Sequence, residues 1–176
     1  MESRNLLSSI LNEFLSMTQL EENELAIGNL KARIRMSIIY YYANAKNYLV
    51  IGTGNKSEIL IGYFTKHGDG ACDMEPIGDL YKTEVFKLSE FLNVQKEIID
   101  KPPRAGLWAN QTDEDEIGMG YDLLDKILYL YSEKDMNEPE IAEKLEISVD
   151  DVNMIINKII RSEHKSKVPE YPQKTI

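Results

Sequence analysis

The sequence is poor in cysteine and in positive charge, and each shortage excludes a class of protein. Its 176 residues include one cysteine, Cys72, so no disulfide forms within the chain and a reducing compartment, the cytoplasm, is expected. The 20 lysines and arginines are outnumbered by 30 aspartates and glutamates, and a net charge of −10 disfavours nucleic acids and anionic membranes as partners. No apolar run approaches the roughly 20 residues that span a bilayer, and the acidic N-terminus is not that of a signal peptide.

The N-terminal part is predicted to be helical. Apolar residues recur at helical spacing over 6–15, a polar linker follows at 18–23, and a second helix is expected over 29–45. The residues expected on the buried side of the second helix are Ala32, Ile39, Tyr42 and Ala43.

A strand, a turn and a helix follow one another over 48–63. The apolar run Tyr48–Gly52 predicts a strand buried on both faces, and Gly-Thr-Gly-Asn then leads into a helix. Free backbone N–H groups at such a helix start predict an anion site, and Lys56 adds a charge. The carboxylate of Glu58 suits Mg²⁺, which prefers oxygen ligands. Ordinary turn chemistry with Ser57 as N-cap explains the segment equally well, and both interpretations stay open.

The second half of the chain is predicted to be mostly helical. Asp79 is a plausible N-cap for a helix over 81–92 with Val85, Leu88 and Phe91 facing inward. Thr112 is expected to cap a helix with four acidic residues in its first turn, whose apolar stripe runs on to Tyr131. Helices over 138–145 and 148–160 follow, the second capped by Ser148. Their spacing is that of a helix-turn-helix, but the acidic start of the second helix would repel DNA.

Basic side chains are expected at the positive ends of two helices. Lys31, Arg33 and Arg35 fall near the predicted start at 29, and Lys82 falls in the first turn of the helix over 81–92. The helix dipole disfavours cations there, which indicates an anionic ligand or partner nearby. A solvated face with local ion pairs is the alternative.

The number of strands is too small for the fold that the first strand requires. Only Tyr48–Gly52 is convincing and 75–80 is doubtful, because Pro76 has no N–H for a sheet. We therefore expect either that another chain completes the sheet or that N-terminal strands are missing.

Four segments, 28–36, 50–85, 101–125 and 162–169, together resemble NAD synthetases in content and order. The resemblance implies an α/β fold of the adenine-nucleotide α-hydrolase-like (Rossmann-like) type, whose parallel sheet is incomplete here because its N-terminal strands are missing. It implies one partial domain, comprising a leading helix and linker (1–27), a nucleotide-binding and deamido-NAD-binding part (28–135) and a C-terminal helix pair with a basic tail (136–176).

The resemblance also implies a reaction and a set of site residues. Such enzymes join ammonia to deamido-NAD with ATP and Mg²⁺, through an adenylate, and release AMP and pyrophosphate. The implied ATP contacts are Thr53, Lys82 and the position of Arg104; the implied Mg²⁺ ligand is Glu58; the implied deamido-NAD contacts are Asn29, Arg33, Lys66, Asp73, His164 and Lys165. Family members are homodimers that bind deamido-NAD near the subunit interface.

Two features depart from the family pattern. Arg104 stands where relatives usually carry Ser or Thr, and the SGGxDS loop that cradles pyrophosphate is absent. The chain by itself is therefore predicted to make no NAD. The alternatives are a catalytically dead remnant that acts as an interaction or dimerisation subunit, and an ATP-pyrophosphatase with a different acyl acceptor.

Overall fold

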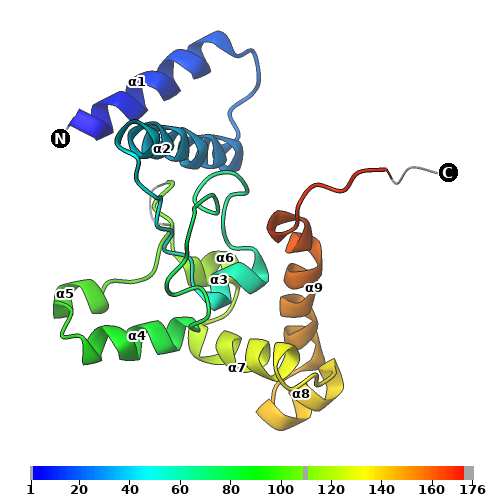
Figure 1. Ribbon diagram of the computed structural model, residues 1–176. Coiled ribbons are helices and arrows are strands. Elements are labelled where there is room, and N and C mark those ends of the chain that lie inside the picture. Colours follow the sequence, from blue (N-terminus) through cyan, green and yellow to red (C-terminus); the bar gives the residue numbers. More distant parts are fainter. Residues whose placement is uncertain (1, 109–110, 173–176) are drawn as a thin grey trace.

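The computed structural model describes residues 2–108 and 111–172, and this part of the chain forms nine α-helices (Figure 1). They are α1 (Glu2–Met17), α2 (Glu24–Lys46), α3 (Lys56–Ile61), α4 (Lys82–Phe91), α5 (Lys96–Ile99), α6 (Asp113–Ile117), α7 (Tyr121–Ser132), α8 (Glu138–Leu145) and α9 (Val149–Ser166). The helices predicted near 6–15, 138–145 and 148–160 are confirmed as α1, α8 and α9.

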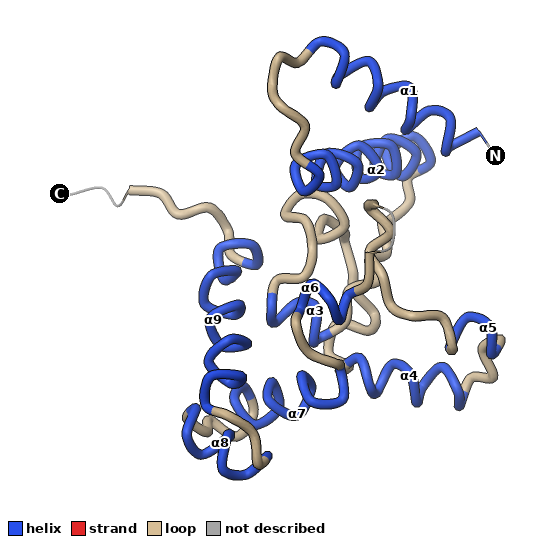
Figure 2. Tube along the Cα trace, turned by 180° about the vertical axis from the view of Figure 1, so that it is seen from behind, coloured by secondary structure: helices blue, strands red, loops and turns tan. Residues whose placement is uncertain are grey.

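The predicted strand Tyr48–Gly52 is reduced to one parallel β-bridge, between Ile51 and Met74, and Figure 2 shows no strand within the described ranges. Gly52 N–H donates to the Met74 carbonyl at 2.8 Å, and Asp73 N–H donates to the Val50 carbonyl at 2.9 Å. The parallel direction of this bridge agrees with the parallel sheet that was predicted. The prediction that Tyr48–Gly52 is buried on both faces is wrong. Exposed fractions are 72% for Leu49 and 53% for Ile51, because no further strand among the described residues covers this edge.

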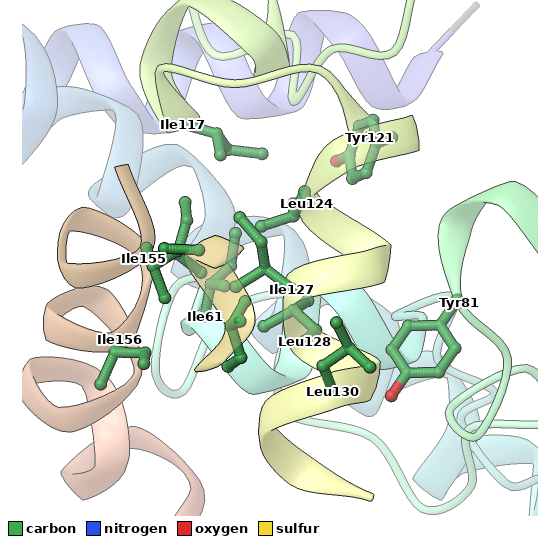
Figure 3. Close-up of a cluster of buried hydrophobic side chains, with 13 residues drawn as sticks. Ile61, Tyr81, Ile117, Tyr121, Leu124, Ile127, Leu128, Leu130, Ile155 and Ile156 are labelled. Carbon is green, nitrogen blue, oxygen red and sulfur yellow. The ribbon is translucent and has the colours of Figure 1, made fainter. Parts of the chain in front are cut away.

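The core lies where α3, α6, α7, α8 and α9 meet (Figure 3). On α7, Leu124, Ile127 and Leu128 are 0% exposed, since apolar residues at helical spacing form one continuous stripe. Ile141 of α8 and Ile155 of α9 are also 0% exposed and close the cluster. The amphipathic faces predicted in the C-terminal half therefore account for this core.

The α1–α2 pair lies at the opposite end of the molecule from α7 and α8 in both views (Figures 1 and 2). Ala32 and Ala43 are buried as predicted, but Ile39 and Tyr42 are 51% and 56% exposed, so their predicted burial is wrong. Among the described helices α1 makes the main contacts with α2, and these two side chains nevertheless stay more than half exposed.

Helix α2 begins earlier than predicted. Asn23 is its N-cap, and the Asn23 side chain accepts the Ala26 N–H at 2.9 Å. Lys31, Arg33 and Arg35 therefore lie beyond the first turn, and the argument that they oppose the dipole is wrong, because that effect is confined to the first turn.

The start and end of α4 also differ from the prediction. Tyr81 is the N-cap, whereas Asp79 pairs with Lys56, Nζ to Oδ1 at 3.0 Å. Phe91, predicted to face inward, is 79% exposed.

The predicted caps of α6 and α9 are confirmed. Thr112 Oγ accepts the Asp115 N–H at 3.2 Å, and Ser148 Oγ accepts the Asp151 N–H at 3.1 Å. The apolar stripe that follows Thr112 is divided between α6 and α7, because Gly118 at φ +83° ends α6 in a left-handed conformation.

Candidate functional site

Two adjoining pockets of about 660 Å³ and 310 Å³ lie beside the 52–55 turn and the loop 62–70. The residues that line both are Thr53, Tyr63, Phe64, Asp69 and Lys165. Asn29 lines only the larger pocket and Glu58 only the smaller. The pockets thus bring together side chains from α2, α3, the loop and α9.

The 52–55 turn passes close to the 72–75 segment. A Cβ at Gly52 would lie 2.6 Å from Cys72 Sγ, and one at Gly54 would lie 2.8 Å from Glu75 Oε1. Glycine at position 52 therefore permits the close approach of Cys72, whereas a Cβ at position 54 would meet only the carboxylate end of the flexible Glu75 side chain.

The start of α3 is not the open anion cradle that the sequence predicted. Asn55 is the N-cap, and Asn55 and Glu58 form a capping box in which each side chain accepts the other's backbone N–H, at 3.1 and 3.2 Å. Lys56 N–H donates to the Leu80 carbonyl at 2.8 Å. The prediction of free amides here is wrong for these three residues, and so is the choice of Ser57 as N-cap.

The charge of Lys56 is also committed elsewhere. Its ammonium contacts Asp79 and Glu133 at 3.0 and 2.8 Å, and these hydrogen bonds raise the pKa of Lys56. Lys56 therefore serves an ion-pair network away from the pockets.

Lys82 and Glu58 form an ion pair at the edge of the smaller pocket. Lys82 Nζ lies 3.0 Å from Glu58 Oε1, and the two side chains are 17% and 18% exposed. The Lys82 ammonium also lies 5.3 Å from the centre of the Tyr121 ring. Lys82 is the first residue of α4 and so lies in the first turn, as predicted, where the helix dipole disfavours a cation.

A buried network that sequence analysis did not identify lies under this pair. The Asp125 carboxylate accepts hydrogen bonds from the Ser57 hydroxyl and from the Thr83 N–H, the latter at 2.8 Å. Ser57 and Asp125 are 0% and 6% exposed. The available signal was the place of Asp125 beside Leu124 and Leu128 on the apolar stripe of α7, because an ionisable residue on a buried face needs partners.

The loop 62–70 is attached to the end of α9. Lys165 Nζ donates to the Gly62 and Phe64 carbonyls at 2.7 and 2.9 Å, and Lys66 Nζ donates to the His164 carbonyl. Burial lowers the pKa of Lys165. Gly62 has φ +67°, and a Cβ there would lie 2.1 Å from Ser162 Cβ, so glycine permits the close approach of α9.

Helix α2 contacts the same loop. Asn29 Oδ1 accepts the Thr65 hydroxyl at 2.7 Å, and Arg33 Nε donates to the Lys66 carbonyl at 3.3 Å. Thr65 N–H donates to Asp69 Oδ1 at 2.9 Å, which orders the loop. Asn29, Arg33, Lys66, His164 and Lys165 are therefore gathered around one loop.

Two of the predicted site residues, Asp73 and Arg104, belong neither to this group nor to the Glu58–Lys82 pair. Asp73 accepts the Val50 N–H at 2.7 Å and the Tyr40 hydroxyl at 3.3 Å, so it fastens the β-bridge segments together. Arg104 is exposed in the loop between α5 and α6.

The acidic start of α6 contacts two tyrosines. Tyr63 and Tyr121 each donate to Asp113 at 3.1 Å, and Asp113 is 3% exposed. Burial raises the pKa of both tyrosine hydroxyls, with the neighbouring carboxylates adding to the effect. Asp113 therefore has a structural role at the start of α6, which depends on two tyrosine hydroxyls as well as on the helix dipole.

Glu58 is the residue from which Mg²⁺ ligation was predicted. Within 2–108 and 111–172, no three His, Cys, Asp or Glu residues are grouped so as to hold a metal. Each carboxylate oxygen of Glu58 already accepts one hydrogen bond and has a second lone pair free. This donor set fits Mg²⁺ only in its usual mode with nucleotides, in which one or two carboxylates, phosphates and water complete the shell.

A protein-family model described as NAD synthase matches residues 3–169. The chain belongs to the NAD synthase family. NH(3)-dependent NAD(+) synthetase of Methanocaldococcus jannaschii is 54% identical over 153 residues, covering 87% of this chain and 59% of the relative. NH(3)-dependent NAD(+) synthetase of Sulfurisphaera tokodaii is 52% identical over 165 residues, covering 93% of this chain and 58% of the relative. The chain thus spans about three-fifths of the length of these NAD synthase relatives.

Solved structures give the same family. NMN synthetase from Francisella tularensis matches with a TM-score of 0.80 and 39% identity, covering 94% of this chain and 64% of that one. NH3-dependent NAD synthetase from Campylobacter jejuni matches with a TM-score of 0.75 and 34% identity, covering 95% and 63%. The predicted NAD synthetase fold is confirmed to this extent, while the extended parallel sheet is not observed in the described residues. None of the described helices has the length and apolarity to cross a bilayer.

Proposed function

We propose that this chain forms the substrate-binding part of an enzyme that amidates deamido-NAD to NAD with ammonia and ATP. The nicotinate carboxylate attacks the α-phosphorus of ATP, the bond to pyrophosphate breaks, and an adenylate forms. Ammonia then attacks the activated carbonyl carbon, AMP leaves, and the nitrogen loses a proton. The observation that carries the proposal is the Glu58–Lys82 pair beside pockets lined by Thr53 and Lys165, in a chain of the NAD synthase family.

The ATP end of the proposed site consists of Thr53, Lys82 and Arg104. The Lys82 ammonium neutralises phosphate charge in a partly buried place, where such an interaction is stronger than in bulk water. Glu58 would hold Mg²⁺, which, when bound, neutralises further phosphate charge.

The proposed deamido-NAD contacts are Asn29, Arg33, Lys66, Asp73, His164 and Lys165. The half-buried Lys165 supports this assignment, since it lines both pockets and its hydrogen-bond acceptors at Gly62 and Phe64 are neutral carbonyls, which leaves Asp69 as a nearby negative charge that a phosphate would supplement. A homodimer with deamido-NAD near the subunit interface, located in the cytoplasm, belongs to the same proposal.

The 176-residue polypeptide by itself is proposed to be inactive, because its sequence contains no SGGxDS loop. The test is to incubate it with Mg-ATP, deamido-NAD and ammonium and to measure NAD by chromatography, with the Methanocaldococcus jannaschii relative as positive control. NAD formed at enzymic rates would contradict the proposed inactivity.

Binding of deamido-NAD tests the site independently of turnover. Saturation-transfer NMR is expected to detect the ligand, and Lys165→Gln is expected to weaken it, whereas Lys144→Gln on the exposed side of α8 is the matched control. If neither deamido-NAD nor Mg-ATP binds while the chain self-associates in sedimentation analysis, the non-catalytic interaction subunit becomes the better account.

Nicotinate mononucleotide is a second candidate substrate, favoured by the likeness to the Francisella tularensis NMN synthetase. It shares the nicotinate and one phosphate with deamido-NAD but lacks the AMP half. Parallel titrations distinguish the two, since a deamido-NAD site should bind the larger molecule more tightly.

A further inference from the structure

The network of Ser57 and Asp125 joins α3, α4 and α7 directly beneath the Glu58–Lys82 pair. Besides donating to Asp125, the Ser57 hydroxyl accepts the Lys82 N–H at 2.9 Å. Asp125 accepts the next N–H of α4, that of Thr83, at 2.8 Å. The first two backbone N–H groups of α4 therefore bond to one buried hydroxyl and one buried carboxylate.

These bonds fix the backbone on both sides of the ion pair. Ser57 immediately precedes Glu58 on α3, and Thr83 immediately follows Lys82 on α4. The relative placement of the two helix starts thus determines whether Lys82 Nζ can lie 3.0 Å from Glu58 Oε1.

A carboxylate is required at position 125 because both of its oxygens accept. An asparagine of the same shape offers one acceptor oxygen and one donor NH₂ group. If the asparagine oxygen faces the Thr83 N–H, the Ser57 hydroxyl hydrogen loses its acceptor. In the reverse orientation the asparagine NH₂ group faces the Thr83 N–H, so two donors oppose each other and no hydrogen bond forms between them. The negative charge also stabilises the N-terminus of α4.

We propose that Asp125 is a positioning residue, which acts through Ser57 and the first turn of α4 to hold Lys82 opposite Glu58. Of the residues involved only Glu58 lines a pocket, so any effect of Asp125 on a ligand must pass through Lys82 and its pairing with Glu58. The inference rests on the proposed role of Lys82 in binding polyphosphate.

The first test needs no ligand. A double-mutant cycle measures the coupling between Glu58 and Lys82. It compares the urea unfolding of the parent, Glu58→Gln, Lys82→Met and the double variant, and it is repeated in the D125N background. The cycle cancels the loss of the Glu58 capping bond, because that loss occurs equally with and without Lys82. We expect a coupling of about fivefold in the unfolding constant, falling below about twofold with D125N.

A matched control separates positioning from loss of stability. Ile127→Val, on the same helix and 0% exposed, should lower stability and leave the Glu58–Lys82 coupling unchanged. If D125N does not fold, Ser57→Ala is the second variant. It removes the hydroxyl that connects Asp125 to the Lys82 N–H, and it should abolish the Glu58–Lys82 coupling in the same way. Undiminished coupling in D125N or in Ser57→Ala would overturn the inference.

The second test uses Mg-ATP as the probe, by calorimetric titration. D125N should weaken Mg-ATP binding in the otherwise unchanged chain but not in the Lys82→Met background. Equal weakening in both backgrounds would contradict action through Lys82. Failure of every form to bind Mg-ATP would count against the proposed nucleotide site, while the ligand-free cycle still decides the role of Asp125.

Discussion

The helices around α7 bury their apolar faces, whereas the N-terminal region, which comprises α1, α2 and residues 48–52, leaves much of its apolar surface exposed. Leu124 and Leu128 are 0% exposed, whereas Leu6, Phe14 and Leu49 are 46%, 54% and 72% exposed. In the first region, α3, α6, α8 and α9 cover α7 from several sides (Figure 3). In the second, α1 and α2 mainly contact each other. Amphipathic sequence thus supplies an apolar face, while burial depends on which elements are present to cover it.

We call the helices around α7 the closed region and the N-terminal region the open region. The largest expected effect comes from truncating a buried side chain in the closed region. Leu128→Ala should lower the free energy of unfolding by about 3 kcal/mol, through lost apolar burial and the cavity left behind. Leu49→Ala, in the open region, should change it by less than about 0.5 kcal/mol. Urea unfolding followed by circular dichroism measures both, and equal losses would contradict the contrast between the regions.

The second effect tests how α9 is held to the closed region. Gly62→Ala should cost about 2 kcal/mol or more, because it adds a steric clash with Ser162 to the cost of a left-handed alanine. Gly106→Ala is the matched control, since Gly106 has φ +66° with nothing within 4 Å of the added Cβ, so only about 1 kcal/mol is expected. Thermal unfolding of the two variants should therefore differ.

Alkaline pH should weaken the closed region through Tyr121. Burial, followed by the charges of Asp113 and Glu58, raises the pKa of Tyr121 in the folded state. Above about pH 10 the unfolded chain loses the tyrosine proton while the folded chain keeps it, so stability falls by up to about 1.4 kcal/mol per pH unit. In urea titrations between pH 8 and 11, Tyr121→Phe should show a shallower decline than the parent; an identical decline would exclude Tyr121 as the cause.

The smallest effect on stability is expected in the open region, with a larger effect on association. Leu49→Lys should leave the unfolding free energy within about 0.5 kcal/mol of the parent, because the side chain is already in water. It should reduce self-association in sedimentation velocity, since exposed apolar edges favour it. A large stability loss would show that this edge is covered in solution.

Sequence predicted the features whose causes are local. The helices near 6–15, 138–145 and 148–160 follow from apolar spacing, and the caps Thr112 and Ser148 bond to residues a few positions away. The misses occurred where distant segments decide the outcome. Phe91 and Tyr42 lie on apolar faces of correctly predicted helices, yet they are 79% and 56% exposed. Tyr48–Gly52 has strand composition without the neighbours that a sheet needs.

The candidate site shows the same division. The proximity of Glu58 and Lys82, expected from the family resemblance, is present. Asp125 was not identified, because its two hydrogen-bond partners are distant in sequence. Ser57 lies 68 residues away and Thr83 lies 42 residues away, so no local sequence pattern indicates these contacts.

Two of the hydrogen bonds that attach α9 to the loop 62–70 come from a single side chain of α9. The acceptors at Gly62 and Phe64 are main-chain carbonyls, which every amino acid possesses, whereas the donor is the Lys165 side chain. A side-chain change at Phe64 leaves its acceptor in place, while one change at position 165 removes both bonds together. On the loop side the attachment depends on the Lys66 side chain, which donates to the His164 carbonyl, and on Gly62, which leaves no room for a Cβ beside Ser162.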